Sequence, residues 1–119
     1  MKRFPSIKKN PDFRRVYENG HSRADRCLVL YAMKNGREET RIGISTSKKI
    51  GNSIIRHRMT RLLREAFRLH REQIKQGYDL VVVVRTGAAG KSFWEIEKSY
   101  LHLMQLQGLM TGCSGHTNG

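Results

Sequence analysis

Residues 48–71 of this chain, KKIGNSIIRHRMTRLLREAFRLHR, combine a pattern of aliphatic side chains with a pattern of basic side chains. At about 100° per residue, one arc of a helix over this segment is aliphatic and the opposite arc is basic. The aliphatic arc consists of Ile55, Met59, Leu62, Leu63, Ala66 and Leu69. Opposite lie His57, Arg61, Arg64, Arg68 and Arg71, with Arg56 and Arg58 on the flanks. The segment therefore predicts a helix that buries one side and presents cations on the other.

The positive charge of the chain is concentrated in two segments. The formal net charge is +13, with eight basic and three acidic residues in residues 1–26 and nine and two in residues 48–75. Arginine, the main cation of the helix, makes planar, bidentate contacts with phosphate. A solvated charged face and a membrane surface are the alternatives, but an apolar arc buried under a sheet cannot also enter lipid. The pattern favours a nucleic-acid-binding face.

Periodicity and turn residues predict six elements in a single domain. They are a helix over about 11–19, strands over 26–33 and 40–47, a helix over about 52–76, a strand over 78–85 and a last helix from residue 92. The order α-β-β-α-β-α is that of an α+β sandwich with helices packed on a central sheet. The domain is expected to span residues 1–106. The polar, glycine-rich residues 107–119 are expected to form a disordered tail.

Local signals predict where the helices begin and end. Asn10 is the expected N-cap of the first helix, and Gly20 is its expected C′ residue. Gly77 is expected to end the long helix. Ser92 and Glu95 have capping-box spacing at the start of the last helix. Its residues available for packing are Trp94, Tyr100, Leu101, Leu103, Met104 and Leu106.

The turn before the basic helix has features that suit phosphate. Residues 45–52, STSKKIGN, bring hydroxyls, two lysines and unpaired backbone N–H groups to a helix N-terminus. The turn is not a P-loop, because the G-x-x-x-x-G-K-[ST] spacing is absent. Asn52 is expected to cap the helix, which is compatible with phosphate binding by Lys48 and Lys49.

Aromatic residues near the N-terminus have two interpretations. Phe13 and Tyr17 share one helix face, Tyr31 lies on a following strand, and Arg14 is adjacent in sequence. Aromatic rings interleaved with arginine bind single-stranded RNA, because the bases stack and arginine holds the backbone. Short amphipathic helices usually bury their aromatic residues, so the pattern alone favours a core role.

The residues give no pattern for catalysis or for a bound metal. The chain contains no carboxylate pair, no Ser-His-Asp order and no H-E-x-x-H motif. Cys27 and Cys113 are too few for a disulfide framework and are expected to be reduced thiols. The sequence has no apolar stretch long enough for a signal peptide or a membrane span. We expect a cytoplasmic protein.

Residues 47–65, SKKIGNSIIRHRMTRLLRE, resemble the protein subunit of bacterial ribonuclease P, which carries S-x-K-K-x-G-x-A-x-x-R-N-R-x-K-R. Residues 8–20, with the pattern K-K-N-x-x-F-x-x-V-Y-x-x-G, look like the opening helix of that family. The resemblance covers about residues 6–104. Three positions depart from the motif: His57 replaces the usual asparagine, Thr60 a common lysine and Ser53 a typical alanine.

The resemblance implies a fold similar to ribosomal protein S5 domain 2, with a left-handed βαβ crossover through the basic helix. It implies two partners, the catalytic RNA of ribonuclease P and precursor tRNA, and neither DNA nor a membrane. The RNA would cleave the 5′ leader with Mg²⁺ held mainly by RNA, so no catalytic residue and no protein-bound cofactor is expected. The residues expected to bind the catalytic RNA are Lys48, Lys49, Asn52, Arg56, His57, Arg58, Arg61, Arg64 and Arg68. Those expected to bind the leader are Phe13, Arg14, Tyr17, Tyr31, Ser45 and Ser47.

Two other functions are compatible with the size and charge of the chain. One is a ribosomal or other structural RNA-binding protein. The other is a ribonuclease that acts without an RNA subunit. Cleavage of precursor tRNA by the protein alone, by the catalytic RNA alone and by both together separates the three.

Overall fold

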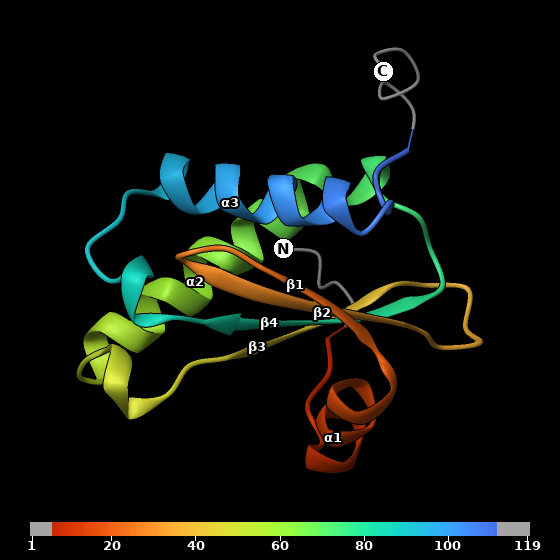
Figure 1. Ribbon diagram of the computed structural model, residues 1–119, viewed down its shortest axis with the longest axis horizontal. Helices are drawn as coiled ribbons and strands as arrows, with labels where there is room; N and C mark the ends of the chain where they lie inside the picture. The colour runs from red at the N-terminus through yellow and green to blue at the C-terminus, as the bar shows by residue number, and fades with distance from the viewer. Residues whose placement is uncertain (1–5, 112–119) are drawn as a thin grey trace.

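The computed structural model describes residues 6–111, which form three layers (Figure 1). In chain order the elements are α1 (Asn10–Asn19), β1 (His21–Ala24), β2 (Leu28–Lys34), β3 (Arg41–Ser45), α2 (Ser53–His70), β4 (Tyr78–Val84) and α3 (Phe93–Leu106). Short 3-10 turns are η1 (Lys48–Ile50), η2 (Arg71–Gln73) and η3 (Thr86–Ala88). The predicted α+β order is confirmed, and β1 is an additional strand. All four residues of β1 are exposed, so hydrophobic alternation gave no signal for it.

The strands form one mixed sheet in the order β1-β2-β4-β3. β2 is antiparallel to both β1 and β4, whereas β3 is parallel to β4. Parallel neighbours need a crossover connection, and α2 supplies it between β3 and β4. In this register Ile42 lies opposite Leu80 and Ile44 opposite Val82. The βαβ unit therefore places the basic helix directly over the sheet.

Helices pack on both faces of the sheet, as the apolar alternation of the strands predicts. Leu30, Leu80 and Val82 are buried on one face with Leu63 of α2 and Leu103 of α3. On the opposite face, α1 packs over a smaller cluster, which contains Ile7, Val16 and Val81. Figure 1 shows α2 and α3 on one side of the sheet and α1 alone on the other. Because a single ten-residue helix covers that second face, part of it stays open.

Asn10 and Gly20, which were expected to be the N-cap and the C′ residue of α1, have other roles in the structure. The N-cap is Lys9 and not Asn10, because the Lys9 carbonyl accepts the first helical hydrogen bonds, from Asp12 and Phe13. Gly20 does follow the helix, but its φ of −83° is not left-handed. A Cβ atom on Gly20 would lie 2.7 Å from the Val16 carbonyl oxygen, so this position needs a glycine for space.

The basic helix α2 is shorter than the predicted span of 52–76. Asn52 caps it as expected, with its side-chain oxygen 3.1 Å from the Ile55 amide nitrogen. It ends at His70, because residues beyond the η2 turn pair with the C-terminal segment: the Lys75 N–H donates to the Leu109 carbonyl at 2.7 Å. Gly77, at φ +91°, belongs to the turn into β4 and does not end the helix.

The buried side of α2 is close to the predicted arc but shifted in rotation. Met59, Leu63 and Ala66 are buried as predicted. Phe67, which the prediction left out, is also buried, whereas Leu69 is 49% exposed. The buried arc is therefore rotated toward Phe67, which also brings Arg56 toward the interior.

Helix α3 has the predicted capping box, in which the Ser92 side chain accepts from the Glu95 N–H and the Glu95 carboxylate from the Ser92 N–H. Tyr100, Leu103 and Met104 are buried, as expected of its packing face. Trp94 and Leu106 are not: they are 72% and 47% exposed.

The ordered chain extends beyond the predicted domain boundary at residue 106. Leu109 is buried, and Met110 forms an isolated β-bridge with Ile74. The Gln107 side chain donates to the Leu30 carbonyl at 3.0 Å. Residues 107–111 therefore pack on the domain, which corrects the expected start of the tail. The rest of the expected tail, residues 112–119, lies outside the described residues.

His70 joins the two helices that cover the sheet. Its Nε2 lies 2.8 Å from the Glu97 carboxylate of α3, and its Nδ1 lies 2.9 Å from the Gln73 side chain. Burial by itself lowers the pKa of His70, but these two hydrogen bonds and the charge of Glu97 raise it above its ordinary value. The contact is therefore strongest when the imidazole is protonated.

The His70 contact predicts a pH-dependent stability of the α2–α3 pair. A group whose pKa is higher in the folded state stabilises it fully below the unfolded pKa and loses that effect as the pH rises through the folded pKa. We expect His70→Ala to lower the unfolding temperature more at about pH 5.5 than at about pH 8.5. Circular dichroism melts of both proteins measure this. Glu97→Gln, which removes the carboxylate, should show the same trend, and an equal loss at both values of pH would contradict the prediction.

Candidate nucleic-acid interface

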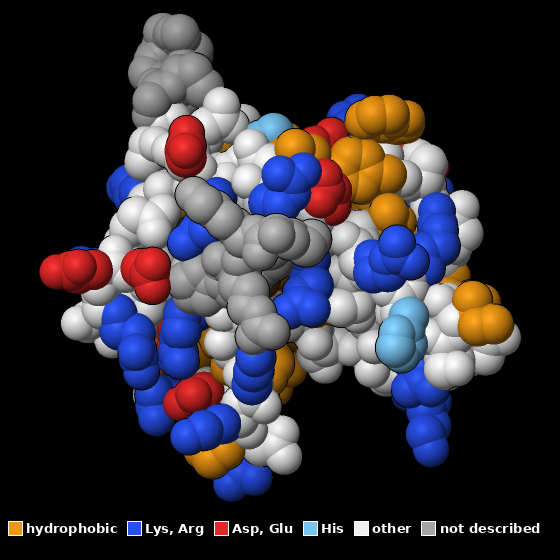
Figure 2. Space-filling view, turned by 180° about the vertical axis from the view of Figure 1, so that it is seen from behind, with side chains coloured by type: hydrophobic (Ala, Val, Ile, Leu, Met, Phe, Trp, Pro, Cys, Tyr) orange, Lys and Arg blue, Asp and Glu red, His pale blue; other side chains and the backbone are white. Residues whose placement is uncertain are grey.

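The basic side of α2 faces away from the core. His57, Arg58, Arg61, Arg64 and Arg68 are all exposed, and the opposite side of the same helix is buried. Figure 2 shows one face of the molecule, on which Lys and Arg side chains in blue outnumber Asp and Glu side chains in red. A rigid helix with an exposed row of cations is suited to the phosphates of a structured polyanion.

Arg68 and Arg58 contact other groups of the protein. Arg68 forms a two-pronged contact with Glu65, with distances of 2.9 Å from Nε and 2.5 Å from Nη2 to the carboxylate oxygens. This contact lowers the pKa of Glu65 and raises the pKa of Arg68. Both side chains are exposed, so water weakens the pair and phosphate can compete for the guanidinium. Arg58 donates from Nη2 to the Lys91 carbonyl at 2.9 Å, which directs it toward the start of α3.

Arg56 is less available than its predicted role requires. The rotation of the buried arc makes the residue half-buried, and its Nε has no hydrogen-bond partner within residues 6–111. A guanidinium carries five N–H donors, so burial of one leaves others for a ligand. Arg56 therefore lies at the edge of the basic face.

The turn before α2 lies beside this face. Lys48 and Lys49 are exposed in η1, and Asn52 follows them as the helix cap. Gly51 has a φ of +153°, a conformation that L side chains rarely adopt. The turn thus brings two lysines to the positive end of an 18-residue helix. The sequence predicted this arrangement.

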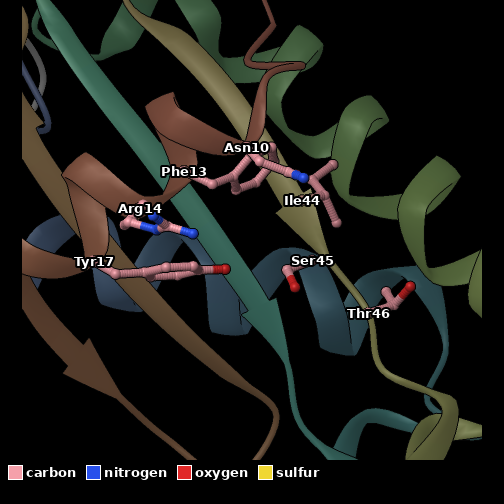
Figure 3. Close-up of a pocket in the computed structure, with 7 residues that line it drawn as sticks. All are labelled: Asn10, Phe13, Arg14, Tyr17, Ile44, Ser45 and Thr46. Carbon is pink, nitrogen blue, oxygen red and sulfur yellow. The ribbon is translucent and has the colours of Figure 1, made fainter.

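A second candidate site lies across the sheet, between α1 and the end of β3. It is a cavity of about 490 Å³ that is lined by Asn10, Phe13, Arg14, Tyr17, Ile44, Ser45 and Thr46. Figure 3 shows Phe13, Arg14 and Tyr17 extending from α1, with the Tyr17 hydroxyl directed toward the side where Ser45 lies. Three predicted leader-binding residues of α1 and Ser45 of β3 thus meet in one cavity.

The aromatic residues that line this cavity or pack beneath it differ in their exposure. The Tyr17 and Tyr31 rings pack edge to face with their centres 5.1 Å apart, and the Phe13 and Tyr17 rings lie 6.4 Å apart. Phe13 and Tyr31 pack against the small cluster beneath α1, whereas Tyr17 is 39% exposed. Phe13 and Tyr31 are therefore partly in the core, although Phe13 still lines the cavity, and Tyr17 is the most exposed of the three rings.

Gly43 of β3 makes room for α1. A Cβ atom at this position would lie 2.8 Å from two atoms of the Phe13 ring and 3.1 Å from the Ile7 side chain. The glycine therefore lets the Phe13 ring approach the strand closely. The sequence showed the glycine but not what approaches it.

The residues that line the cavity differ from the predicted leader-binding residues, because some were not predicted and some predicted ones lie outside the lining. Asn10, Ile44 and Thr46 line the cavity but were not predicted as ligand contacts. The spacing of Asn10 from Phe13, Arg14 and Tyr17 is i, i+3, i+4, i+7, which indicates one helix face. Two predicted residues are not in the lining. Tyr31 packs edge to face against the Tyr17 ring, and Ser47 directly precedes η1.

The structure gives no protein site for a metal and no membrane span in the part of the chain it describes. Residues 6–111 contain no group of three or more His, Cys, Asp or Glu side chains placed to hold a metal ion. No helix among them is both long and apolar enough to cross a bilayer.

Comparison with known families decides what this arrangement belongs to. The model of the family described as Ribonuclease P matches residues 1–107. The chain belongs to the ribonuclease P protein family. The ribonuclease P protein component of Alkaliphilus oremlandii is 43% identical over 110 residues, which cover 92% of this chain and 96% of that protein. That of Clostridium novyi is 46% identical over 111 residues, 92% of this chain and 98% of that protein.

Solved structures of ribonuclease P proteins have the same fold. The Staphylococcus aureus protein matches with a TM-score of 0.85 and 35% identity, over 92% of this chain and all of that one. The Thermotoga maritima protein matches with a TM-score of 0.80 and 27% identity, over 87% and 97% of the two chains. The order α1-β1-β2-β3-α2-β4-α3 is therefore that of ribonuclease P proteins.

Membership of this family establishes the activity that the chain serves. It is a component of ribonuclease P, the endoribonuclease that processes the 5′ leader of precursor tRNA, and it assists that processing. Its partners are the ribonuclease P RNA and precursor tRNA, and the holoenzyme uses Mg²⁺. The alternative of a ribosomal protein is thereby set aside.

Proposed function

We propose that the basic side of α2 and the turn before it bind the catalytic RNA of ribonuclease P. The observation that carries this proposal is the exposure of His57, Arg61 and Arg68 on a helix whose other side is buried in the core. The proposed contacts are Lys48, Lys49, Asn52, Arg56, His57, Arg58, Arg61, Arg64 and Arg68. Asn52 contributes mainly by capping α2, and Arg56 from the edge of the face.

The cavity between α1 and β3 is the proposed site for the 5′ leader of precursor tRNA. The proposed contacts are Phe13, Arg14, Tyr17, Tyr31, Ser45 and Ser47. Tyr17 offers a ring face on which a base can stack, and Arg14 lies one helical turn away on the same side. Hydroxyls from β3 can donate to phosphate or sugar oxygens. A single strand fits this opening because its bases are not already paired.

The two sites explain how a protein without catalytic residues assists cleavage. Contacts to the leader exist for precursor tRNA and are lost in the mature product, so they favour substrate over product. Cations close to the RNA reduce phosphate repulsion, which raises the effective affinity of the RNA for the Mg²⁺ that it holds. The chemistry itself belongs to the RNA and its metal ions. The protein's side chains bind and position.

A cytoplasmic protein that binds neither DNA nor membranes is consistent with this role. The apolar side of α2, which a membrane would need, is used in the core with Met59 and Leu63. The leader cavity takes an unpaired strand rather than a duplex. Labelled DNA duplex and anionic vesicles should each compete weakly, if at all, with catalytic RNA for the protein at physiological salt.

Cleavage of precursor tRNA in three parallel mixtures tests the proposed division of labour. At low Mg²⁺ we expect product from the protein and the catalytic RNA together, and none from either alone. Cleavage by the protein alone would show a catalytic site in this chain. The catalytic RNA should also be shown to be active by itself at high salt. If the protein and the RNA together give no cleavage at the Mg²⁺ concentrations where that RNA is active, the assisting role is contradicted.

Tyr17→Ala is expected to weaken the binding of leader-bearing tRNA by about 1–3 kcal/mol, the contribution of one base stacked on an aromatic ring. Affinity for mature tRNA should hardly change, because the mature 5′ end does not reach the cavity. Equilibrium binding of both tRNAs to the assembled holoenzyme measures the difference. Tyr17→Phe keeps the ring and should retain most of the affinity. If the affinity for both tRNAs fell equally, Tyr17 would have a purely structural role.

A further inference from the structure

Trp94, at the start of α3, is exposed where a core residue was expected. It is 72% exposed, and it is the only tryptophan in the sequence. A single exposed apolar residue needs no explanation, so its neighbours decide whether it has a function. Neither the basic face of α2 nor the leader cavity includes it.

The Trp94 ring is held in place by the protein. It packs edge to face with Phe93, with ring centres 5.2 Å apart and planes at 70°. Phe93 in turn packs against the main core, so it anchors the ring without covering it. The capping box of Ser92 and Glu95 fixes the backbone on either side. A pre-positioned aromatic ring loses little conformational entropy when a ligand stacks on it.

Two lysines flank Trp94 in the sequence, one before α3 and one on it. Lys91 precedes it by three residues, and Lys98, which is exposed, follows it by four, one turn along the same face. The Lys91 carbonyl accepts from Arg58 of α2 at 2.9 Å, so the segment that leads into α3 contacts the basic face.

The carboxylates nearest to Trp94 are engaged within the protein. Glu95 accepts from the Ser92 N–H at 3.0 Å and lies 3.7 Å from the Lys91 ammonium, and both contacts lower its pKa. Glu97 is held by His70 of α2. These acids are therefore partly neutralised where a polyanion would approach, which lowers the repulsion it meets.

We propose that Trp94, supported by Phe93 and flanked by Lys91 and Lys98, stacks on an unpaired base of the catalytic RNA. An exposed ring beside cations provides the two contacts that unpaired RNA needs, a stacking surface and phosphate neutralisation. An apolar protein partner fits less well, because the exposed ring is small in area and bordered by charge. The inference rests on the proposed function, since it extends the RNA-binding face of α2 onto α3.

The fluorescence of the single tryptophan tests the proposal directly. Titrating the protein with catalytic RNA should quench the Trp94 emission in a saturable way, with the same midpoint as binding followed by an independent method. Precursor tRNA alone should quench it much less at equal concentration. An emission that does not change on saturation with catalytic RNA would overturn the proposal, and quenching by precursor tRNA alone would assign the ring to another RNA.

Substitutions at Trp94 then measure what the stack contributes. Trp94→Ala should weaken catalytic-RNA binding by about tenfold, and Trp94→Phe should recover most of that loss because it keeps an aromatic face. Trp94→Leu, which is apolar but not aromatic, should behave like alanine. Leu106→Ala removes another exposed apolar side chain from the other end of α3 and is the matched control, with unchanged binding. Equal affinities of the alanine, leucine and wild-type proteins would overturn the proposal.

Failure of this inference can be told apart from failure of the proposed function. If Trp94→Ala binds normally while replacement of α2 arginines weakens binding and its salt dependence, the RNA lies on α2 alone and the Trp94 contact is wrong. If neither change affects binding, the RNA contacts a different surface and both proposals fail. Melting curves of the Trp94 variants should match the wild type, because the side chain is mostly in water.

Discussion

Replacing Arg61 and Arg64 together by alanine is expected to make catalytic-RNA binding less sensitive to salt. Each lost phosphate contact removes about 0.7–0.9 from the slope of log K against log salt concentration, so the pair should remove about 1.4–1.8. Affinity should fall most at low salt, where counterion release contributes most. Binding measured at several salt concentrations with the full-length protein gives both quantities.

A charge-matched variant separates this effect from a change in net charge. Lys34→Ala plus Arg37→Ala also removes two cations, from the end of β2 and the loop after it, and both side chains are exposed. That variant should keep the wild-type slope, because Lys34 and Arg37 lie outside the proposed RNA face. If the two double variants have equal slopes, the RNA is attracted by net charge and is not docked on α2.

Arg41→Ala is expected to have the largest effect on stability, about 3–5 kcal/mol of unfolding free energy, because it leaves a buried carboxylate without its partner. Asp79 of β4 is fully buried, and Arg41 of β3 contacts it with Nε at 2.8 Å and Nη2 at 2.6 Å. Asn35 donates to the same carboxylate at 2.9 Å. Denaturant unfolding of the wild type and the variant measures the loss.

The same ion pair has a functional consequence through α1. Arg41 also lies 3.6 Å from Asp12, so one guanidinium joins β3, β4 and the helix that forms one wall of the leader cavity. At temperatures where Arg41→Ala stays folded, it should therefore also lose part of the preference for leader-bearing over mature tRNA. The partly exposed pair of Arg71 and Glu39, at 3.8 Å, is a suitable control, and Arg71→Ala should cost less than about 1 kcal/mol.

The pH dependence of the Arg41 variant follows from Asp79. Burial by itself raises the pKa of Asp79, but hydrogen bonds from Arg41 and Asn35 lower it below its ordinary value. A lowered folded-state pKa gives stability above the unfolded pKa that is lost as the pH falls through the folded pKa. Without Arg41, burial should raise this pKa instead. The difference in stability between wild type and variant should therefore shrink as the pH falls toward about 4.

Local patterns predicted those parts of the site that depend on neighbours along the chain. The two sides of α2, its cap at Asn52 and the capping box of α3 follow from spacings of three and four residues, which one helical turn brings together. The alternation in β2 likewise predicted a strand with two apolar faces. Such features need no knowledge of which element packs where.

Contacts between distant residues decided the rest. β1 has no apolar pattern and exists because its backbone pairs with β2, and α2 stops at His70 because the following segment pairs with residues 109–111. Only the packed fold shows that Phe13 lies on Gly43, that Arg41 neutralises Asp79, and that Trp94 stays in solvent while Phe67 is buried.

The sequence by itself determined that this chain has a cation-bearing helix between two strands of an α+β domain. Helix and strand periodicities depend only on residues close together in the sequence, and the spacing of the cations places them on one side of the helix. The tertiary structure alone decided which aromatic rings are exposed. Exposure of a ring depends on how many elements cover it, and a lone α1 over one sheet face leaves Tyr17 accessible where a second helix would have buried it.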